Sequence, residues 1–262
     1  MSFAITQPIS SCTPFLYPWE PSNPQNPTGA VVPRETLQSL VDIARKSAIT
    51  LLSDEVYRPL FQDTSAAPPS LLSFGYEQTI VTGSVSKAFS LAGLRIGWIA
   101  SLDKSIIDAC AASRDYTTIT VGLIDDTIAS FALAPECVHN LLKRNLGLAR
   151  TNLEILERFI NSHRWACDWV KPSAGTTAFV RFKKRGEPVD DSILCEKLLE
   201  RTGVMVVPGS FCFGRDQDFR GYVRMGYVCQ TETLEIGLER LSQFLNDGYG
   251  DVPVSKKVLV AL

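Results

Sequence analysis

The first half of the chain alternates short apolar runs with amphipathic segments. The apolar runs, each of which predicts a strand, are ITLLSDE (49–55), QTIVTGSVS (78–86) and GLRIGWIAS (93–101). Residues 34–48 instead repeat apolar positions at helical spacing, and the apolar face holds Leu37, Leu40, Val41 and Ala44. Strands that alternate with helices and are apolar throughout indicate an α/β fold with a mostly parallel sheet covered on both faces.

The second half opens with a long amphipathic segment over residues 137–162. Its apolar positions recur at steps of three and four, at Leu142, Leu146, Ala149, Leu153, Leu156 and Ile160. This spacing predicts one long helix that bridges two domains. An α+β pattern follows, with strands at 176–182, 204–209 and 221–228 and helices at 191–203 and 232–245. We therefore expect a partial large domain over 1–135, a small C-terminal domain over 136–250, and a patternless tail over 251–262.

Composition narrows the classes of partner. The chain has 262 residues, 45% hydrophobic and 21% charged, which is ordinary for a globular protein with a sizeable core. Its formal net charge of −2 provides no basic field for nucleic acid or an anionic membrane. No apolar run approaches the roughly 20 residues that span a bilayer, and the first residues lack a secretory pattern. We expect neither a nucleic-acid nor a membrane partner.

Cysteine and histidine usage suggests a compartment and argues against a metal site. The seven cysteines are dispersed without a CxxC pair, which is typical of reduced thiols in a cytoplasmic protein. Only His139 and His163 are present, too few for the usual zinc ligand sets or a His-dependent triad. We therefore expect no metal.

Four short motifs hold the residues with distinctive chemistry. They are Asn26 in NPQNPTG (23–29), Asp54 and Tyr57 in SDEVYRP (53–59), Ser84, Ser86, Lys87 and Arg95 in SVSKAFSLAGLRIG (84–97), and Arg224 in YVRMGY (222–227). Two of the motifs directly follow predicted strands, and ligands in open α/β sheets gather where strands end. Two cations inside a small, apolar run indicate either an exposed loop or a bound anion beside it.

Each motif alone has a simpler interpretation. NPQNPTG is compatible with a mere turn, Asp54 with a helix N-cap, and Lys87 with an exposed loop. Arg95 could cover apolar surface with its stem, and Arg224 could lie on an exposed edge strand. Together, however, the motifs supply what pyridoxal 5'-phosphate (PLP) requires: a Schiff-base lysine, an acid for the pyridine nitrogen, and cations with hydroxyls for the phosphate.

In this order the motifs resemble those of the fold-type I PLP-dependent aminotransferases of the class I/II superfamily, over about Phe15 to Leu245. The resemblance implies a PLP-dependent transferase-like large domain with a mainly parallel sheet, followed by a smaller α+β domain. It also implies the site: Lys87 as the catalytic Schiff-base lysine, Asp54 at the pyridine nitrogen, Asn26 and Tyr57 at the ring hydroxyl, Ser84, Ser86 and Arg95 at the phosphate, and Arg224 at the substrate carboxylate.

The implied activity is that of a homodimeric aminotransferase acting on an amino acid and a 2-oxo acid. A PLP-dependent lyase, cyclase or oxidase of amino-acid-derived metabolism, or a truncated non-catalytic homologue, remains an alternative. In the family, a phosphate-binding loop and a ring-stacking aromatic residue precede the NPxNPTG motif, which begins here at Asn23. We therefore expect an incomplete sheet, without the usual N-terminal segment, and weak binding of PLP by this chain alone.

Overall fold

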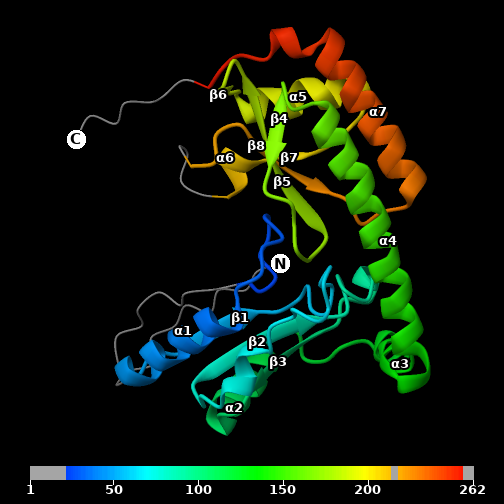
Figure 1. Cartoon of the computed structure of the whole chain (residues 1–262). Coiled ribbons are helices and arrows are strands. Elements are labelled where there is room, and N and C mark those ends of the chain that lie inside the picture. The colour runs from blue at the N-terminus through cyan, green and yellow to red at the C-terminus, as the bar shows by residue number, and fades with distance from the viewer. Residues whose placement is uncertain (1–21, 214–217, 256–262) are drawn as a thin grey trace.

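The computed structural model describes residues 22–213 and 218–255, and it shows two lobes joined by one long helix (Figure 1). The first lobe contains the three-stranded sheet β1-β2-β3, and the second contains a five-stranded sheet. The long helix α4 (Pro135–Ser162) runs along one side of both lobes. It confirms the long helix that the spacing predicts.

The first sheet presents the carboxyl ends of two parallel strands at one rim. Strand β1 (Leu51–Asp54) pairs in parallel with β2 (Thr79–Ser84), so that Asp54 lies opposite Thr82. Ser22 forms a parallel bridge to Asp54 on the other side. The third strand, β3 (Gly97–Ser101), is antiparallel to β2. The expected parallel pairing therefore applies to β1 and β2, and β3 departs from it.

Helix α1 (Arg34–Ser47) covers one face of this sheet as its pattern predicts. Leu37, Val41 and Ala44 are buried in a cluster with Leu51 and Val81 of the strands. Burying these side chains removes apolar surface from water and fixes the helix against β1 and β2. The 3-10 helix η1 (Leu71–Phe74) joins the same cluster through Leu71.

The far side of the first lobe is more exposed than the sequence predicts. Helices α2 (Lys104–Arg114) and α3 (Leu123–Leu133) follow β3, and neither was predicted. Trp98 and Ile99 of β3 are 42% and 47% exposed, and Phe131 of α3 is 71% exposed. The expectation of a sheet covered on both faces is therefore wrong for β3 within the described residues. An apolar run indicates that a strand can be buried, but it does not specify which other segment covers the strand.

The second lobe is an antiparallel sheet packed against helices. Its strands are β4 (Cys167–Trp169), β5 (Thr177–Lys184), β6 (Glu187–Pro188), β7 (Val207–Pro208) and β8 (Tyr222–Gly226). Its helices are α5 (Asp191–Thr202), α6 (Gly209–Cys212) and α7 (Thr231–Asp247). The order β4-β5-β8-β7 places β8 between two neighbours. The predicted strand over 204–209 shortens to the two residues of β7.

Several hydrogen bonds join the two lobes, and part of the tail is also packed. The Gln62 backbone N–H donates to the Ser173 carbonyl at 2.9 Å, and Phe61 bridges Ala174. The Gln62 side-chain amide donates to the Tyr227 hydroxyl at 3.2 Å, and the Gly175 N–H donates to the Leu60 carbonyl at 2.9 Å. In the tail, Val252 is buried, whereas residues 256–262 lie outside the described residues. A helix long and apolar enough to cross a bilayer is absent from the described ranges.

Candidate active site

Three of the four motifs meet at the carboxyl-end rim of β1 and β2. Asp54 is the last residue of β1, and Ser84 is the last residue of β2. The Ser22–Asp54 bridge places the NPQNPTG motif beside the end of β1. The side chains therefore collect where ligands bind in parallel sheets, as the strand order predicts.

The NPQNPTG motif forms a closed turn that packs against the second lobe. The Gly29 N–H donates to the Gln25 carbonyl at 2.8 Å, and the Thr177 hydroxyl donates to the Pro27 carbonyl at 3.1 Å. Gly29 has φ +66°, and a Cβ there would lie 2.6 Å from the Ala174 carbonyl oxygen. Only glycine meets both conditions without strain. The turn presents Asn26 toward the second lobe.

Asp54 keeps one carboxylate oxygen available. Its Oδ1 accepts hydrogen bonds from the Val56 N–H and the Thr82 hydroxyl, both at 3.1 Å. Its Oδ2 accepts none within the described residues, and the side chain is only partly buried. The chain after Asp54 forms a turn, so the helix N-cap alternative does not apply. The orientation leaves an anionic acceptor at the rim.

Tyr57 is a buried phenol close to two charges. It is 5% exposed, and burial raises the pKa of its hydroxyl while the Arg224 charge opposes that rise. The Asp54 carboxylate raises the same pKa further. At neutral pH the group is therefore a protonated hydrogen-bond donor that lies within electrostatic reach of Arg224 and Asp54.

Arg224 lies in the middle of the second sheet and faces the turn. Strand β8 is flanked by β5 and β7, which excludes the edge-strand alternative. The Arg224 Nη1 donates to Asn26 Oδ1 at 3.2 Å, and its guanidinium lies 5.1 Å from the centre of the Phe213 ring. The aromatic face holds one side of the guanidinium plane. Its edge remains able to bind a carboxylate.

Lys87 projects from a tight turn that follows β2. Its side chain is exposed and forms no hydrogen bond or ion pair with any described residue. The backbone around it is fixed, because the Ser90 N–H donates to the Lys87 carbonyl at 3.1 Å and the Leu91 N–H to the Val85 carbonyl at 3.0 Å. The exposed-loop alternative therefore describes this lysine correctly. Its amine is unpaired on a well-anchored turn.

The remaining three residues gather on the same loop. The Ser84 hydroxyl lies 2.8 Å from both the Ile96 carbonyl and the Ser86 hydroxyl. Arg95 is exposed, and its Nη1 donates to the Ala92 carbonyl at 2.9 Å. An anion here would compete with backbone carbonyls for Ser84 and Arg95. No carboxylate bonds to these three side chains among the described residues.

The structure brings the predicted residues into two groups on one rim. Asn26, Asp54, Tyr57 and Arg224 form the first, and Ser84, Ser86, Lys87 and Arg95 form the second. Thr82 and Phe213, which contact Asp54 and Arg224, were not predicted. Thr82 could have been found from its place on the strand that ends at Ser84. Phe213 carries no such signal, because its contact depends on the folded chain.

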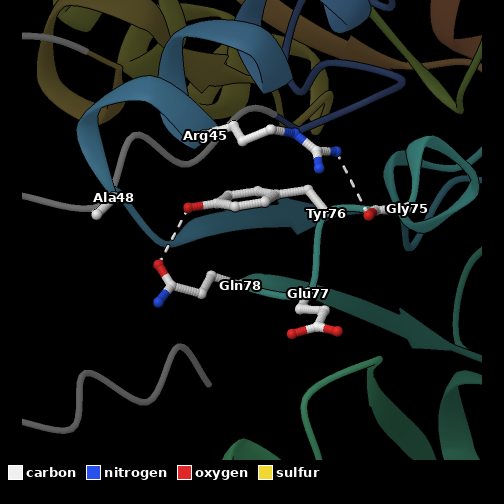
Figure 2. A pocket seen from close by; sticks show the side chains of 6 residues that line it. All are labelled: Arg45, Ala48, Gly75, Tyr76, Glu77 and Gln78. Carbon is white, nitrogen blue, oxygen red and sulfur yellow. Dashed lines mark hydrogen bonds between the residues drawn. The ribbon is translucent and has the colours of Figure 1, made fainter.

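A hollow in the first lobe lies at the end of the β1-β2-β3 sheet opposite the candidate site. Figure 2 shows Arg45, Tyr76 and Gln78 around it. Gln78 directly precedes β2, so the hollow is at the amino ends of the parallel strands. The Tyr76 hydroxyl is engaged in structural hydrogen bonds, since it lies 2.9 Å from the Ile49 carbonyl and 3.0 Å from Gln78 Oε1.

The available groups fit PLP by their chemistry. The free Asp54 oxygen suits a protonated pyridine nitrogen, and the unpaired Lys87 amine suits an aldehyde. The Tyr57 hydroxyl is a donor for the ring oxygen. Two serine hydroxyls beside a guanidinium suit a phosphate, although they are partly engaged with backbone carbonyls.

Comparison with known proteins gives a consistent result. The profile of the family described as aminotransferase class I and II matches residues 22–241. The chain is 32% identical to capreomycidine synthase of Streptomyces vinaceus, over 85% of this chain and 54% of the relative. It is also 32% identical to aspartate aminotransferase of Thermotoga maritima, over 86% and 55%. The structure of a PLP-dependent aminotransferase from Streptococcus suis superposes with a TM-score of 0.77 and 38% identity, over 91% of this chain and 58% of that one. The chain thus spans about half the length of these curated relatives.

Proposed function

The chain belongs to the aminotransferase class I and II family, and we propose that it carries PLP-dependent transamination between an amino acid and a 2-oxo acid. The observation that carries this proposal is the juxtaposition of Asn26, Asp54, Tyr57 and Arg224 at the strand ends that also lead into the Lys87 turn. These residues come from both lobes. Arg224 and Asn26 are 198 positions apart in the sequence, so only the folded chain brings them together.

We assign each side chain a role from its chemistry. PLP, when bound, supplies an electron sink for the bond broken at the substrate α-carbon. When PLP is bound, Lys87 would hold its aldehyde carbon until the substrate amine replaces the lysine there, and the released Lys87 amine would then move the α-proton. Asp54 would hold a proton at the pyridine nitrogen through Oδ2, since its Oδ1 already accepts from Val56 and Thr82. Asn26 and Tyr57 orient the ring oxygen.

The remaining roles concern anions. Ser84, Ser86 and Arg95 bind the phosphate by charge-assisted hydrogen bonds. Arg224 binds the substrate α-carboxylate by the edge of its guanidinium, while Asn26 and Phe213 hold the guanidinium in place.

A second candidate is a PLP-dependent lyase, cyclase or oxidase. It is supported by the similarity to a synthase at the same identity as to an aminotransferase. All these reactions need the same Lys87 and Asp54 chemistry. They differ in whether turnover requires a 2-oxo acid.

The predicted division into domains at 1–135 and 136–250, the cytoplasmic location and the homodimer belong to the same proposal. The start of α4 at Pro135 supports the division, and the six free cysteines among the described residues support the location. The exposed apolar side chains Trp98, Ile99 and Phe131 support a covering partner, which in a homodimer is a second copy. Sedimentation velocity of the purified chain tests the dimer.

The test of the function uses the full chain incubated with PLP and a panel of amino acids. We expect 2-oxo-acid-dependent turnover, and borohydride trapping should place PLP on Lys87. Lys87→Ala should abolish both, whereas Lys104→Ala should change neither, since Lys104 is exposed and paired with Asp108 on α2. Ammonia or peroxide release without a 2-oxo acid would favour the second candidate. Absence of any trapped PLP on Lys87 would leave only a non-catalytic homologue.

A further inference from the structure

The turn that carries Lys87 is held from behind by a buried asparagine on α4. The Asn145 Nδ2 donates to the Ala88 carbonyl at 2.9 Å, and Asn145 is 1% exposed. Ala88 directly follows Lys87 and is 0% exposed. The bond therefore joins the long helix to the peptide group next to the lysine.

The surroundings of this bond are apolar. Ala88 lies in a cluster with Val85, Phe89 and Ala129, and Leu141 and Leu142 of α4 pack against that cluster. A polar side chain in such a cluster is unfavourable unless it is hydrogen-bonded, and a buried carbonyl has the same requirement. A leucine at this helix position would continue the apolar face. The asparagine therefore adds a directional bond where packing alone would add none.

The direction of the Asn145 hydrogen bond matters because few other contacts hold Lys87 in place. The Lys87 side chain is exposed and unpaired, so only its backbone determines where its flexible stem begins. Ser90 and Leu91 close the turn from within through their N–H groups. The Asn145 side chain adds a hydrogen bond that ties the turn to a separate element, α4.

We propose that Asn145 is a positioning residue for Lys87 and that it acts through the Ala88 carbonyl. This inference rests on the proposed role of Lys87 as the residue that captures PLP. Displacing the turn from α4 would let the amine sample directions in which it cannot reach an aldehyde held at the strand ends.

The same helix offers a matched control in Asn152. Asn152 is 0% exposed, and its Nδ2 donates to the carbonyls of Tyr227 and Cys229, both at 2.8 Å. It therefore shares the helix, the burial and the bond type of Asn145, but it anchors the end of β8 instead of the Lys87 turn. Replacing either residue by leucine removes a donor to buried backbone carbonyls.

The experiment compares the full chain with Asn145→Leu and Asn152→Leu by two readouts. The first is amide hydrogen exchange at Ser90 and Leu91 without PLP, which we expect to rise roughly tenfold in Asn145→Leu and to stay unchanged in Asn152→Leu. The second is the fraction of trapped PLP found on Lys87 relative to Lys104. We expect this fraction to fall roughly tenfold only in Asn145→Leu.

Thermal unfolding shows whether each variant is folded, and Asn145→Ala replaces Asn145→Leu if the leucine does not fold. Unchanged exchange at Ser90 and Leu91, or an equal change in Asn152→Leu, would overturn the proposal. The proposed function is tested separately. If the unsubstituted chain traps no PLP on Lys87, the proposed role of Lys87 is refuted. The exchange result still decides whether Asn145 holds the turn.

Discussion

The Nη1 of Arg224 donates a 3.2 Å hydrogen bond to Oδ1 of Asn26, although 198 positions separate the two residues in the chain. Arg224 belongs to the central part of the second sheet, and Asn26 belongs to a turn at the rim of the first. The proposed site is therefore divided between the lobes. Its geometry depends on how firmly the two lobes are held together.

Arg224→Lys should raise the KM for the amino-acid substrate about 100-fold, with a smaller effect on kcat. Lysine keeps the charge but loses the planar fork that binds a carboxylate through two hydrogen bonds. Steady-state kinetics with varied amino acid measure the change. Arg181→Lys, on the neighbouring strand β5 opposite Tyr222, is the control and should leave the KM unchanged. Equal effects of the two substitutions would rule out a specific role for Arg224.

Asp54→Asn should separate activity from stability. The amide oxygen can still accept from Val56 and Thr82, so the free energy of unfolding should stay within about 0.5 kcal/mol of the original. The lost charge should lower the turnover rate at least about 100-fold, because a neutral side chain does not hold a proton at the pyridine nitrogen. Urea unfolding and turnover assays measure the two quantities. Full turnover in a stable Asp54→Asn protein would refute the role of Asp54.

Gly29→Ala should disturb the turn that presents Asn26. The new methyl group would meet the Ala174 carbonyl oxygen at 2.6 Å, in addition to the strain of φ +66°. We expect the free energy of unfolding to fall by about 2 kcal/mol or more. Gly75→Ala is the matched control, because Gly75 has φ +67° with nothing within 4 Å of the added methyl group. It should lose only about 1 kcal/mol, and an equal loss in both variants would show that the close approach has no consequence.

Stability should fall in alkaline solution partly because of Tyr227. Burial raises the pKa of its hydroxyl to about 12, above the ordinary value of 10.0. Between these values the folded chain keeps a proton that the unfolded chain releases, so the free energy of unfolding falls as pH rises. The contribution is fully present below the unfolded-state pKa. It is then lost at about 1.4 kcal/mol per pH unit as the pH rises to the folded-state pKa.

The measurement is urea unfolding across that window. Tyr227→Phe should give a shallower decline, although buried Cys167 and Cys195, whose pKa values are also raised to about 12 by burial, will maintain part of it. Tyr116→Phe is the control, since Tyr116 is 91% exposed. A slope that is the same in all three proteins would contradict the assignment to Tyr227.

Periodicity located most of the elements that position the site. The helical spacing over 34–48 and 137–162 corresponds to α1 and α4, and the apolar runs before Asp54 and Lys87 correspond to β1 and β2. These patterns are local, because a helix or strand must bury one face. The convergence of Asp54 and Ser84 on one rim was also predictable, because parallel strands end on the same side.

Other features depended on partners far away in the chain. Asn145 and Asn152 were absent from the predicted apolar face of α4, yet both are buried, because carbonyl groups 57 and 75 positions away satisfy them. The reversed direction of β3 and its exposed side chains also escaped prediction, since an apolar run specifies neither its neighbour nor its orientation.

The sequence by itself determined the family, the identity of the residues that carry chemistry and the strand ends where they gather. Only the tertiary structure decided that Arg224 meets Asn26, that Asp54 keeps one oxygen free and that Lys87 stands exposed on a turn tied to α4. The physical reason is that motif order and periodicity are properties of neighbouring residues. Hydrogen-bond partnership and burial are set by segments that approach one another only when the chain folds.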